Sequence, residues 1–113
     1  MELSLKQIGN KIKMEIKGNI NEKGAEEIKT RFRELNISMV KQVVIDFRGV
    51  SHIGSAGIGK LLLIYKDLAI CGGTVEIENV SQTVFDLFKT LKLDTIFTIT
   101  KAWLLDLRLK NKV

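Results

Sequence analysis

The chain has 113 residues, 45% of them hydrophobic and 27% charged, and this size and composition predict one soluble globular domain that spans residues 1–113. A single cysteine, Cys71, and a single histidine, His52, exclude an internal disulfide and a zinc site built from Cys and His within the chain. The net charge of +5 comes with scattered lysines, so we expect solvated surface charge and no direct contact with nucleic acid.

The N-terminus lacks the apolar segment of a secretory signal, and the longest apolar run is confined to residues 61–65. A helix that crosses a bilayer needs roughly 20 apolar residues. The sequence therefore predicts a cytoplasmic protein without membrane insertion, and the lone cysteine fits that reducing compartment.

The first 18 residues are typical of a β-hairpin. Leu3, Leu5 and Ile8 indicate a short first strand whose alternation is imperfect. In residues 11–18 apolar and charged side chains alternate, which predicts a strand with one buried and one solvated face. A Gly-Asn pair between the two strands supplies the turn.

Residues 22–35 predict an amphipathic helix with Asn21 as its N-cap. The apolar stripe of this helix consists of Ala25, Ile28, Phe32 and Leu35. Glutamates crowd its first half and arginines lie toward its end, an order of charges that agrees with the helix dipole.

Strand and helix patterns alternate along the rest of the chain. We expect strands at residues 42–47, 74–79 and 95–100 and helices at residues 56–70, 82–93 and 102–110, with Ser81 as an N-cap. After the initial hairpin, this order implies parallel strands that helical crossovers connect. The sequence therefore predicts a single α/β domain with a mixed, mostly parallel sheet of about five strands and helices packed on it.

Residues 54–61 (GSAGIGKL) come close to the phosphate-binding loop G-x-x-x-x-G-K-[ST]. Leu61 stands where that loop has the hydroxyl that binds Mg²⁺, and Asp46 precedes the segment instead of following it. We therefore expect Leu61 to be a core residue of a helix. We predict no nucleotide hydrolysis, no cofactor and no metal.

Residue types alone would allow a hydrolase triad of Ser55, His52 and Asp46. The sequence contains no G-x-S-x-G elbow to present the serine, no convincing pair of carboxylates and no dinucleotide-binding turn. We therefore predict that the protein is not an enzyme.

Ser55 lies at the predicted start of the helix at residues 56–70, between Gly54 and Gly57, which leave it uncovered. Two interpretations are open at this point. The hydroxyl can be the helix N-cap and accept hydrogen bonds from the first turn. Alternatively, it is a phosphorylation site, where the helix dipole tolerates a dianion that changes the surface a partner meets.

Residues 43–62 (VVIDFRGVSHIGSAGIGKLL) resemble the STAS domains, a family named for sulfate transporters and anti-sigma-factor antagonists. The family pattern is an apolar strand ending in Asp, a Gly-Val pair, an apolar residue and then Asp-Ser-Ser/Ala-Gly-apolar-Gly. The matching positions are Asp46, Phe47, Gly49, Val50, Ile53, Ser55, Ala56, Gly57, Ile58 and Gly59. Gly54 replaces the family's Asp, and asparagines replace acidic residues in the otherwise matching segment 16–21. Residues 80–97 match as well, so the likeness covers almost the whole chain.

Small stand-alone STAS proteins are typically bacterial partner-switching proteins. The resemblance therefore implies an anti-sigma-factor antagonist that binds a kinase-type anti-sigma factor and thereby releases a sigma factor. It also implies that the kinase phosphorylates Ser55 and ends the complex, and that a phosphatase resets the switch. The residues expected to form the partner-binding surface are Asn21, Gly54, Ser55, Ala56, Gly57 and Lys60. We expect a monomer.

Two other roles stay open for a STAS domain of this kind. One is a subunit of a larger assembly, such as a lipid-transport complex or a stress-signalling scaffold. The other is a module that binds a small ligand or a nucleotide.

Overall fold

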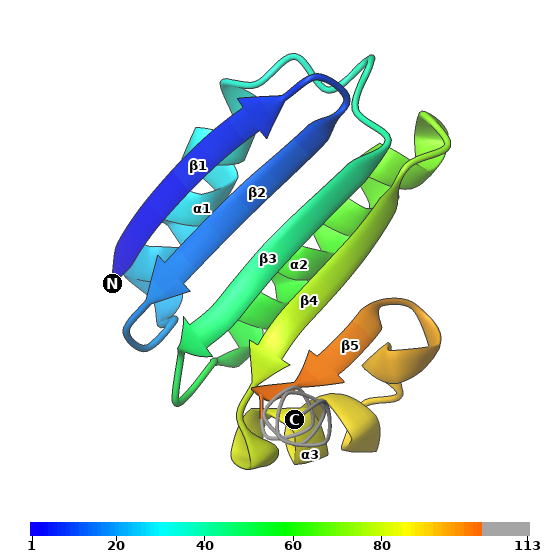
Figure 1. The fold of residues 1–113 in the computed structure, drawn as a ribbon. Coiled ribbons are helices and arrows are strands. Elements are labelled where there is room, and N and C mark those ends of the chain that lie inside the picture. Colours follow the sequence, from blue (N-terminus) through cyan, green and yellow to red (C-terminus); the bar gives the residue numbers. More distant parts are fainter. Residues whose placement is uncertain (103–113) are drawn as a thin grey trace, which may run out of the picture.

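Five strands form one sheet in the computed structural model, which describes residues 1–102 (Figure 1). The strands are β1 (Glu2–Ile8), β2 (Lys11–Lys17), β3 (Gln42–Gly49), β4 (Thr74–Val80) and β5 (Thr98–Lys101). Their order in the sheet follows their order in the chain. β1 runs antiparallel to β2, whereas each of the other neighbouring pairs is parallel. The predicted hairpin and the predicted mixed, mostly parallel sheet are therefore confirmed.

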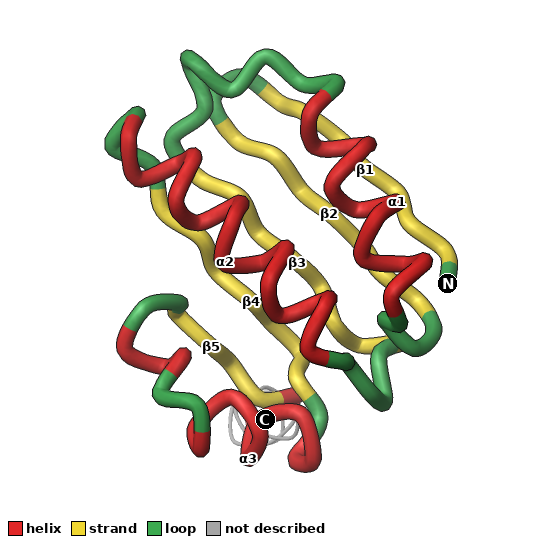
Figure 2. Tube along the Cα trace, turned by 180° about the vertical axis from the view of Figure 1, so that it is seen from behind, coloured by secondary structure: helices red, strands yellow, loops and turns green. Residues whose placement is uncertain are grey.

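Helical crossovers connect the parallel strands. The helices are α1 (Glu22–Arg33), α2 (Ser55–Ile70) and α3 (Gln82–Thr90), and a short 3₁₀ helix, η1 (Leu93–Thr95), precedes β5. α1 and α2 lie side by side across one face of the sheet, as Figure 2 shows. α3 lies at one end of the sheet near β5 (Figures 1 and 2).

The hydrophobic core fills the space between the sheet and the pair α1 and α2. In β2 the side chains of Ile12, Met14 and Ile16 are fully buried, while the charged residues between them are exposed. Burial of one such side chain stabilises the fold by about 1.5–3 kcal/mol. The stripe predicted for the first helix is buried at Ala25, Ile28 and Phe32, whereas the half-buried Leu35 lies beyond the end of α1 at Arg33. No described helix covers the opposite, charged face of β1 and β2.

Two element boundaries near the C-terminus differ from the prediction. The helix predicted at residues 82–93 ends at Thr90, because Lys92 takes a left-handed conformation with φ of 59° and interrupts the helical backbone. η1 then follows with Leu93 buried in the core. For that reason β5 begins later than the strand predicted at residues 95–100.

The helix predicted at residues 102–110 lies outside the described residues, apart from Ala102 at its start. Within residues 1–102, no helix has both the length and the apolar character that a membrane span requires. The longest described helix, α2, has 16 residues and buries Leu61 and Leu68 in the core. The predicted core position of Leu61 is confirmed.

Candidate partner-binding site

Two loops lie next to each other where β2 and β3 end. The loop between β2 and α1 and the loop between β3 and α2 are joined by a parallel bridge between Ile20 and Ile53. Ile20 N–H donates to the carbonyl oxygen of His52 at 3.0 Å, and Gly54 N–H donates to the carbonyl oxygen of Ile20 at 2.9 Å. These contacts hold the start of α1 beside the start of α2.

α1 begins with the N-cap that its sequence predicts. Asn21 Oδ1 accepts a hydrogen bond from Gly24 N–H at 2.9 Å, and the residue stays exposed. Glu22 lies in the first turn, where its negative charge interacts favourably with the helix dipole. The start of α1 is therefore stabilised by its own side chains.

α2 begins without a side-chain cap. Its N-cap residue is Gly54, which is extended at φ −85° and has no side chain that could accept a hydrogen bond, and no acidic residue lies in the first turn. Ser55 is the first helical residue, so the interpretation of Ser55 as the N-cap is wrong. The cap falls one residue earlier because the hydrogen bond to Ile20 fixes Gly54 in the loop. Ser55 is exposed, and its hydroxyl makes no hydrogen bond within the described part of the chain.

Two shallow hollows flank Ala56 on this surface. The Ser55 hollow, of about 370 Å³, is lined by Ile20, Asn21, Glu22, His52, Gly54, Ser55 and Ala56. The interhelical hollow, of about 400 Å³, is lined by Glu22, Ala25, Glu26, Ala56, Gly59, Lys60 and Leu63. The two hollows therefore contain all the predicted surface residues except Gly57. Because the hollows share Glu22 and Ala56, they form one continuous surface over the starts of α1 and α2.

Gly57 and Gly59 lie two positions apart in α2 but have different surroundings. A Cβ atom added to Gly57 would lie 2.7 Å from Ile20 Cγ2 and 2.8 Å from Ile53 Cγ1. The buried Gly57 therefore lets α2 pack on the bridge between the loops and supports the surface from below.

Gly59, in contrast, is exposed, and a Cβ atom there would meet no atom of the described chain within 4 Å. A glycine inside a helix is less stable than alanine by roughly 0.5–1 kcal/mol. No contact among the described residues accounts for this cost at Gly59. An exposed glycine in the interhelical hollow leaves room for another molecule to approach the backbone of α2 closely.

Lys60 connects α2 to α1 through an ion pair. Its Nζ lies 3.3 Å from Glu26 Oε1, and 23% of the Lys60 side chain is exposed. Ion pairs near the surface contribute only about 0–1 kcal/mol, because water screens both charges. The partly exposed Lys60 side chain therefore lines the interhelical hollow while it is paired with Glu26.

His52 and Glu22 line the Ser55 hollow, although sequence reasoning did not include them in the partner-binding surface. The bridge between Ile20 and Ile53 brings their two loops together. The signal for this placement is topological: consecutive parallel strands end at the same edge of a sheet, where binding sites of α/β folds form. No lysine or arginine of the described chain lines the Ser55 hollow, so Glu22 gives it a negative character.

The structure does not assemble a hydrolase triad from Ser55, His52 and Asp46. Asp46 Oδ1 accepts a hydrogen bond from Asn79 Nδ2 at 3.1 Å, and His52 makes no hydrogen bond to either of the other two side chains. Within residues 1–102, no group of His, Cys, Asp and Glu side chains is placed to hold a metal ion.

Residues 2–103 of the chain match the STAS domain family. The structure is similar to the anti-sigma factor antagonist SpoIIAA in its unphosphorylated form, with 19% identity, a TM-score of 0.64 and coverage of 78% of this chain and 82% of that chain. It is also similar to the Bacillus cell fate determinant SpoIIAA in the phosphorylated form, with 18% identity, a TM-score of 0.66 and coverage of 96% and 99%. A candidate anti-sigma factor antagonist from Thermotoga maritima matches with 18% identity, a TM-score of 0.77 and coverage of 88% and 86%. At these identities the structural likeness establishes the shared fold, and the family match establishes kinship: the chain belongs to the STAS domain family.

Proposed function

We propose that this STAS protein is an anti-sigma-factor antagonist that works in the bacterial cytoplasm. Its Ser55 surface, formed by the Ser55 hollow and the interhelical hollow, binds a kinase-type anti-sigma factor and so frees a sigma factor. The kinase then transfers the γ-phosphoryl group of ATP to Ser55 Oγ, and the complex dissociates. A phosphatase restores the binding form. The chain itself catalyses no reaction in this cycle.

The exposed, unbonded hydroxyl of Ser55 beside uncapped backbone is the observation that carries this proposal. A serine whose oxygen capped the helix would be held in place by a backbone N–H group of the first turn. Ser55 has no such bond, because Gly54 occupies the N-cap position. The fold shared with SpoIIAA, which is known in an unphosphorylated and a phosphorylated form, supports the proposal further.

A phosphate on Ser55 would weaken binding through its charge. It adds about −1.5 to −2 charges at neutral pH. No lysine or arginine of the described chain lines the Ser55 hollow, and Glu22 is already there, so no cationic side chain pairs with the new charge. Burying an unpaired ion in an interface costs several kcal/mol, whereas a tenfold loss of affinity needs only about 1.4 kcal/mol.

The same phosphate would leave the fold intact. The start of α2 has unsatisfied backbone N–H groups and the positive end of the helix dipole, and both favour a nearby anion. The modification therefore changes the surface of the protein and leaves its stability nearly unchanged, as a reversible switch requires.

The test is a phosphorylation assay with the purified chain, ATP and each kinase-type anti-sigma factor encoded in the same genome. Intact-mass and peptide mass spectrometry should find one phosphate, on Ser55, and Ser55→Ala should remain unmodified. Ser51→Ala is the matched control, because Ser51 is an exposed serine of the loop between β3 and α2, and its Oγ donates a hydrogen bond to Asn19 Oδ1 at 2.6 Å. We expect Ser51→Ala to be modified as fast as the unaltered chain.

If the chain binds such a kinase tightly but Ser55 stays unmodified, the proposed phosphorylation switch is wrong and only the proposed binding remains. If the chain binds none of these kinases, both the switch and the binding are contradicted. Titration of the chain alone with ATP and GTP separates the remaining alternative: micromolar affinity that Lys60→Ala abolishes would identify a nucleotide-binding module instead.

A further inference from the structure

β1 forms one edge of the sheet, and among residues 1–102 no strand pairs with its outer side (Figure 1). It has seven residues, whereas β5 at the other edge has four. Its register with β2 runs without a shift from Glu2 to Ile8, so no bulge turns the edge away. Natural proteins usually shorten, bulge or cover such an edge, because its free N–H and C=O groups pair with other strands. Within residues 1–102, β1 is neither shortened, bulged nor covered, and its charged residues Glu2 and Lys6 are the only protection of this kind that it carries.

The side chains of β1 alternate between the two faces of the sheet. Leu3 and Leu5 lie on the face that carries the helices, where they are half buried and pack against the core. Glu2, Ser4 and Lys6 are exposed on the opposite face. The hydrophobic layer therefore reaches the edge of the sheet and ends there with two partly exposed leucines.

We infer that β1 pairs antiparallel with β1 of a second copy of this chain, across a two-fold axis at Ser4. In this register Glu2 faces the second copy's Lys6, and Leu3 faces the second copy's Leu5. Ser4 faces its own counterpart on the axis. The two-fold axis generates each pair twice. The dimer therefore has two Glu2–Lys6 pairs on one face of the sheet and two Leu3–Leu5 pairs on the other. Cross-strand pairs of both kinds are stabilising.

Other registers do not offer this complementarity. Residues that face each other across an antiparallel pair lie on the same side of the sheet, so the axis has to pass through a residue. An axis at Leu5 would set Glu2 against Ile8 and Leu3 against Gln7. An axis at Leu3 would set Glu2 against Ser4. Only the axis at Ser4 matches charge with charge and leucine with leucine.

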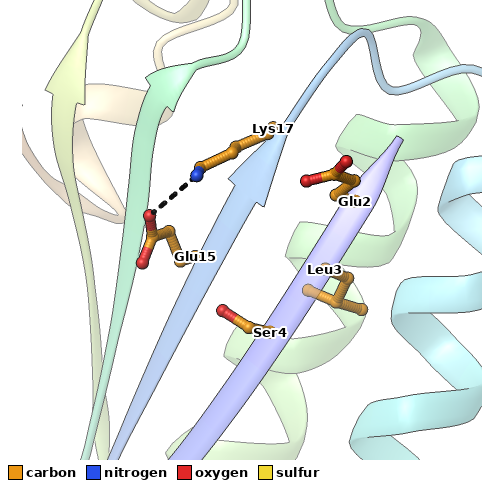
Figure 3. A pocket seen from close by; sticks show the side chains of 5 residues that line it. All are labelled: Glu2, Leu3, Ser4, Glu15 and Lys17. Carbon is orange, nitrogen blue, oxygen red and sulfur yellow. Dashed lines mark ion pairs between the residues drawn. The ribbon is translucent and has the colours of Figure 1, made fainter.

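Glu2 and Lys6 also lack ion-pair partners within the described part of their own chain. Lys6 lies directly opposite Lys13 of β2, a like-charge pair that disfavours the sheet. Glu2 lies opposite Lys17, but the Lys17 Nζ lies 3.9 Å from Glu15 Oε1 (Figure 3). The hollow in Figure 3 measures about 250 Å³, and its lining consists of Glu2, Leu3 and Ser4 from β1 and Glu15 and Lys17 from β2. A second copy would bring a lysine to Glu2 and a glutamate to Lys6.

The resulting dimer has one continuous ten-stranded sheet, because the five strands of each copy join edge to edge. Pairing over one short strand buries less than the roughly 1,200–2,000 Å² of a stable interface. The dimer therefore dissociates on dilution, and the monomer expected from the sequence is its dilute form. No residue of β1 belongs to the Ser55 surface, so this inference stands apart from the proposed function.

Sedimentation velocity of the full chain from about 5 µM to about 500 µM, at low salt, tests the association. We expect a monomer–dimer equilibrium that weakens as salt screens the exposed charges. Lys6→Glu and Glu2→Lys should each weaken dimerisation about tenfold, because like charges then face each other twice. The double variant E2K/K6E should restore it, since both charges are exchanged.

Lys66→Glu is the matched control, because it changes the net charge as much as Lys6→Glu at an exposed position of α2. It should leave dimerisation unchanged. A monomer at every concentration would overturn the inference. So would a dimer that Lys6→Glu and Lys66→Glu weaken equally, or one that the double variant fails to restore.

Disulfide trapping tests the register. In a Cys71→Ser background, Ser4→Cys should crosslink under mild oxidation, because facing Cβ atoms in a strand pair lie about 4.5–5.5 Å apart, close to disulfide distance. Glu2→Cys should crosslink at least about tenfold more slowly, because its counterpart lies four residues further along the paired strand. Faster crosslinking of Leu5→Cys than of Ser4→Cys would place the axis elsewhere and contradict the inference.

Discussion

α1 and α2 begin side by side at the same edge of the sheet, yet their first turns differ. α1 has a side-chain cap from Asn21 and an acidic residue in its first turn, whereas α2 has neither. Ser55 occupies the first position of α2 with a free hydroxyl, although the loops before both helices are joined through Ile20 and Ile53. The start of α1 is therefore stabilised by its own side chains, whereas the start of α2 exposes the serine at which we propose phosphorylation.

Gly57→Ala should produce the largest loss in the free energy of unfolding, because the added methyl group would push α2 away from the two loops that hold the helix starts together. The added Cβ atom would lie within 3 Å of side-chain atoms of both Ile20 and Ile53, and both of these residues are buried in the core. Overpacking of this kind costs about 1–3 kcal/mol in the free energy of unfolding. Urea denaturation measures it, and a variant as stable as the unaltered chain would show that the contact between the loops is loose.

Asn21→Ala tests the capped helix directly. Loss of the hydrogen bond from Gly24 N–H should lower the free energy of unfolding by about 1 kcal/mol. Ser55→Ala is the comparison at the other helix, and it should change stability by less than about 0.5 kcal/mol, because Ser55 caps nothing. Equal losses in the two variants would mean that Ser55 does contribute a cap in solution.

Gly59→Ala should raise stability and reveal whether α2 is approached by a partner. The position is exposed and has open space, so replacement should stabilise the helix by about 0.5–1 kcal/mol. If the kinase approaches the backbone at the interhelical hollow, the same variant should bind it more weakly. Unchanged affinity would confine the contact to the Ser55 hollow.

Gly54→Asp should make the start of α2 resemble the start of α1. The backbone of Gly54 is extended with negative φ, and among residues 1–102 a Cβ atom there would meet only the carbonyl oxygen of Ile20, at 3.7 Å. An aspartate cap should therefore fit and add a few tenths of a kcal/mol, which thermal unfolding detects. The variant also introduces the Asp that the family pattern has before the serine. Faster phosphorylation of Ser55 in this variant would show that the kinase recognises the side chain at position 54.

The sequence predicts most of the fold because its signals are local. Alternation in β2, the stripe and cap of α1 and the burial of Leu61 follow from side-chain patterns within single elements, and the structure confirms them. The 3₁₀ turn before β5 is missed, because it depends on the left-handed backbone of Lys92, and lysine carries no signal for that conformation.

The site is predictable only in part, because it depends on contacts between segments far apart in the chain. The family resemblance identifies Ser55, but the bridge from Ile20 to Ile53 decides that Gly54 is the N-cap and brings His52 into the hollow. Likewise, the sequence gives no signal that distinguishes the surroundings of Gly57 from those of Gly59. Only the packing around each shows that the first supports the site and the second lies open at its surface.

The central proposal is that phosphate on Ser55 weakens partner binding and leaves the fold intact. The most direct test measures two properties of the unmodified protein and of the protein phosphorylated at Ser55: the affinity for the kinase-type anti-sigma factor and the melting temperature. We expect the phosphorylated form to bind at least about tenfold more weakly, which corresponds to about 1.4 kcal/mol, and to keep an almost unchanged melting temperature. Equal affinity of the two forms would contradict the switch. A large drop in melting temperature would contradict the claim that the start of α2 accepts the added charge.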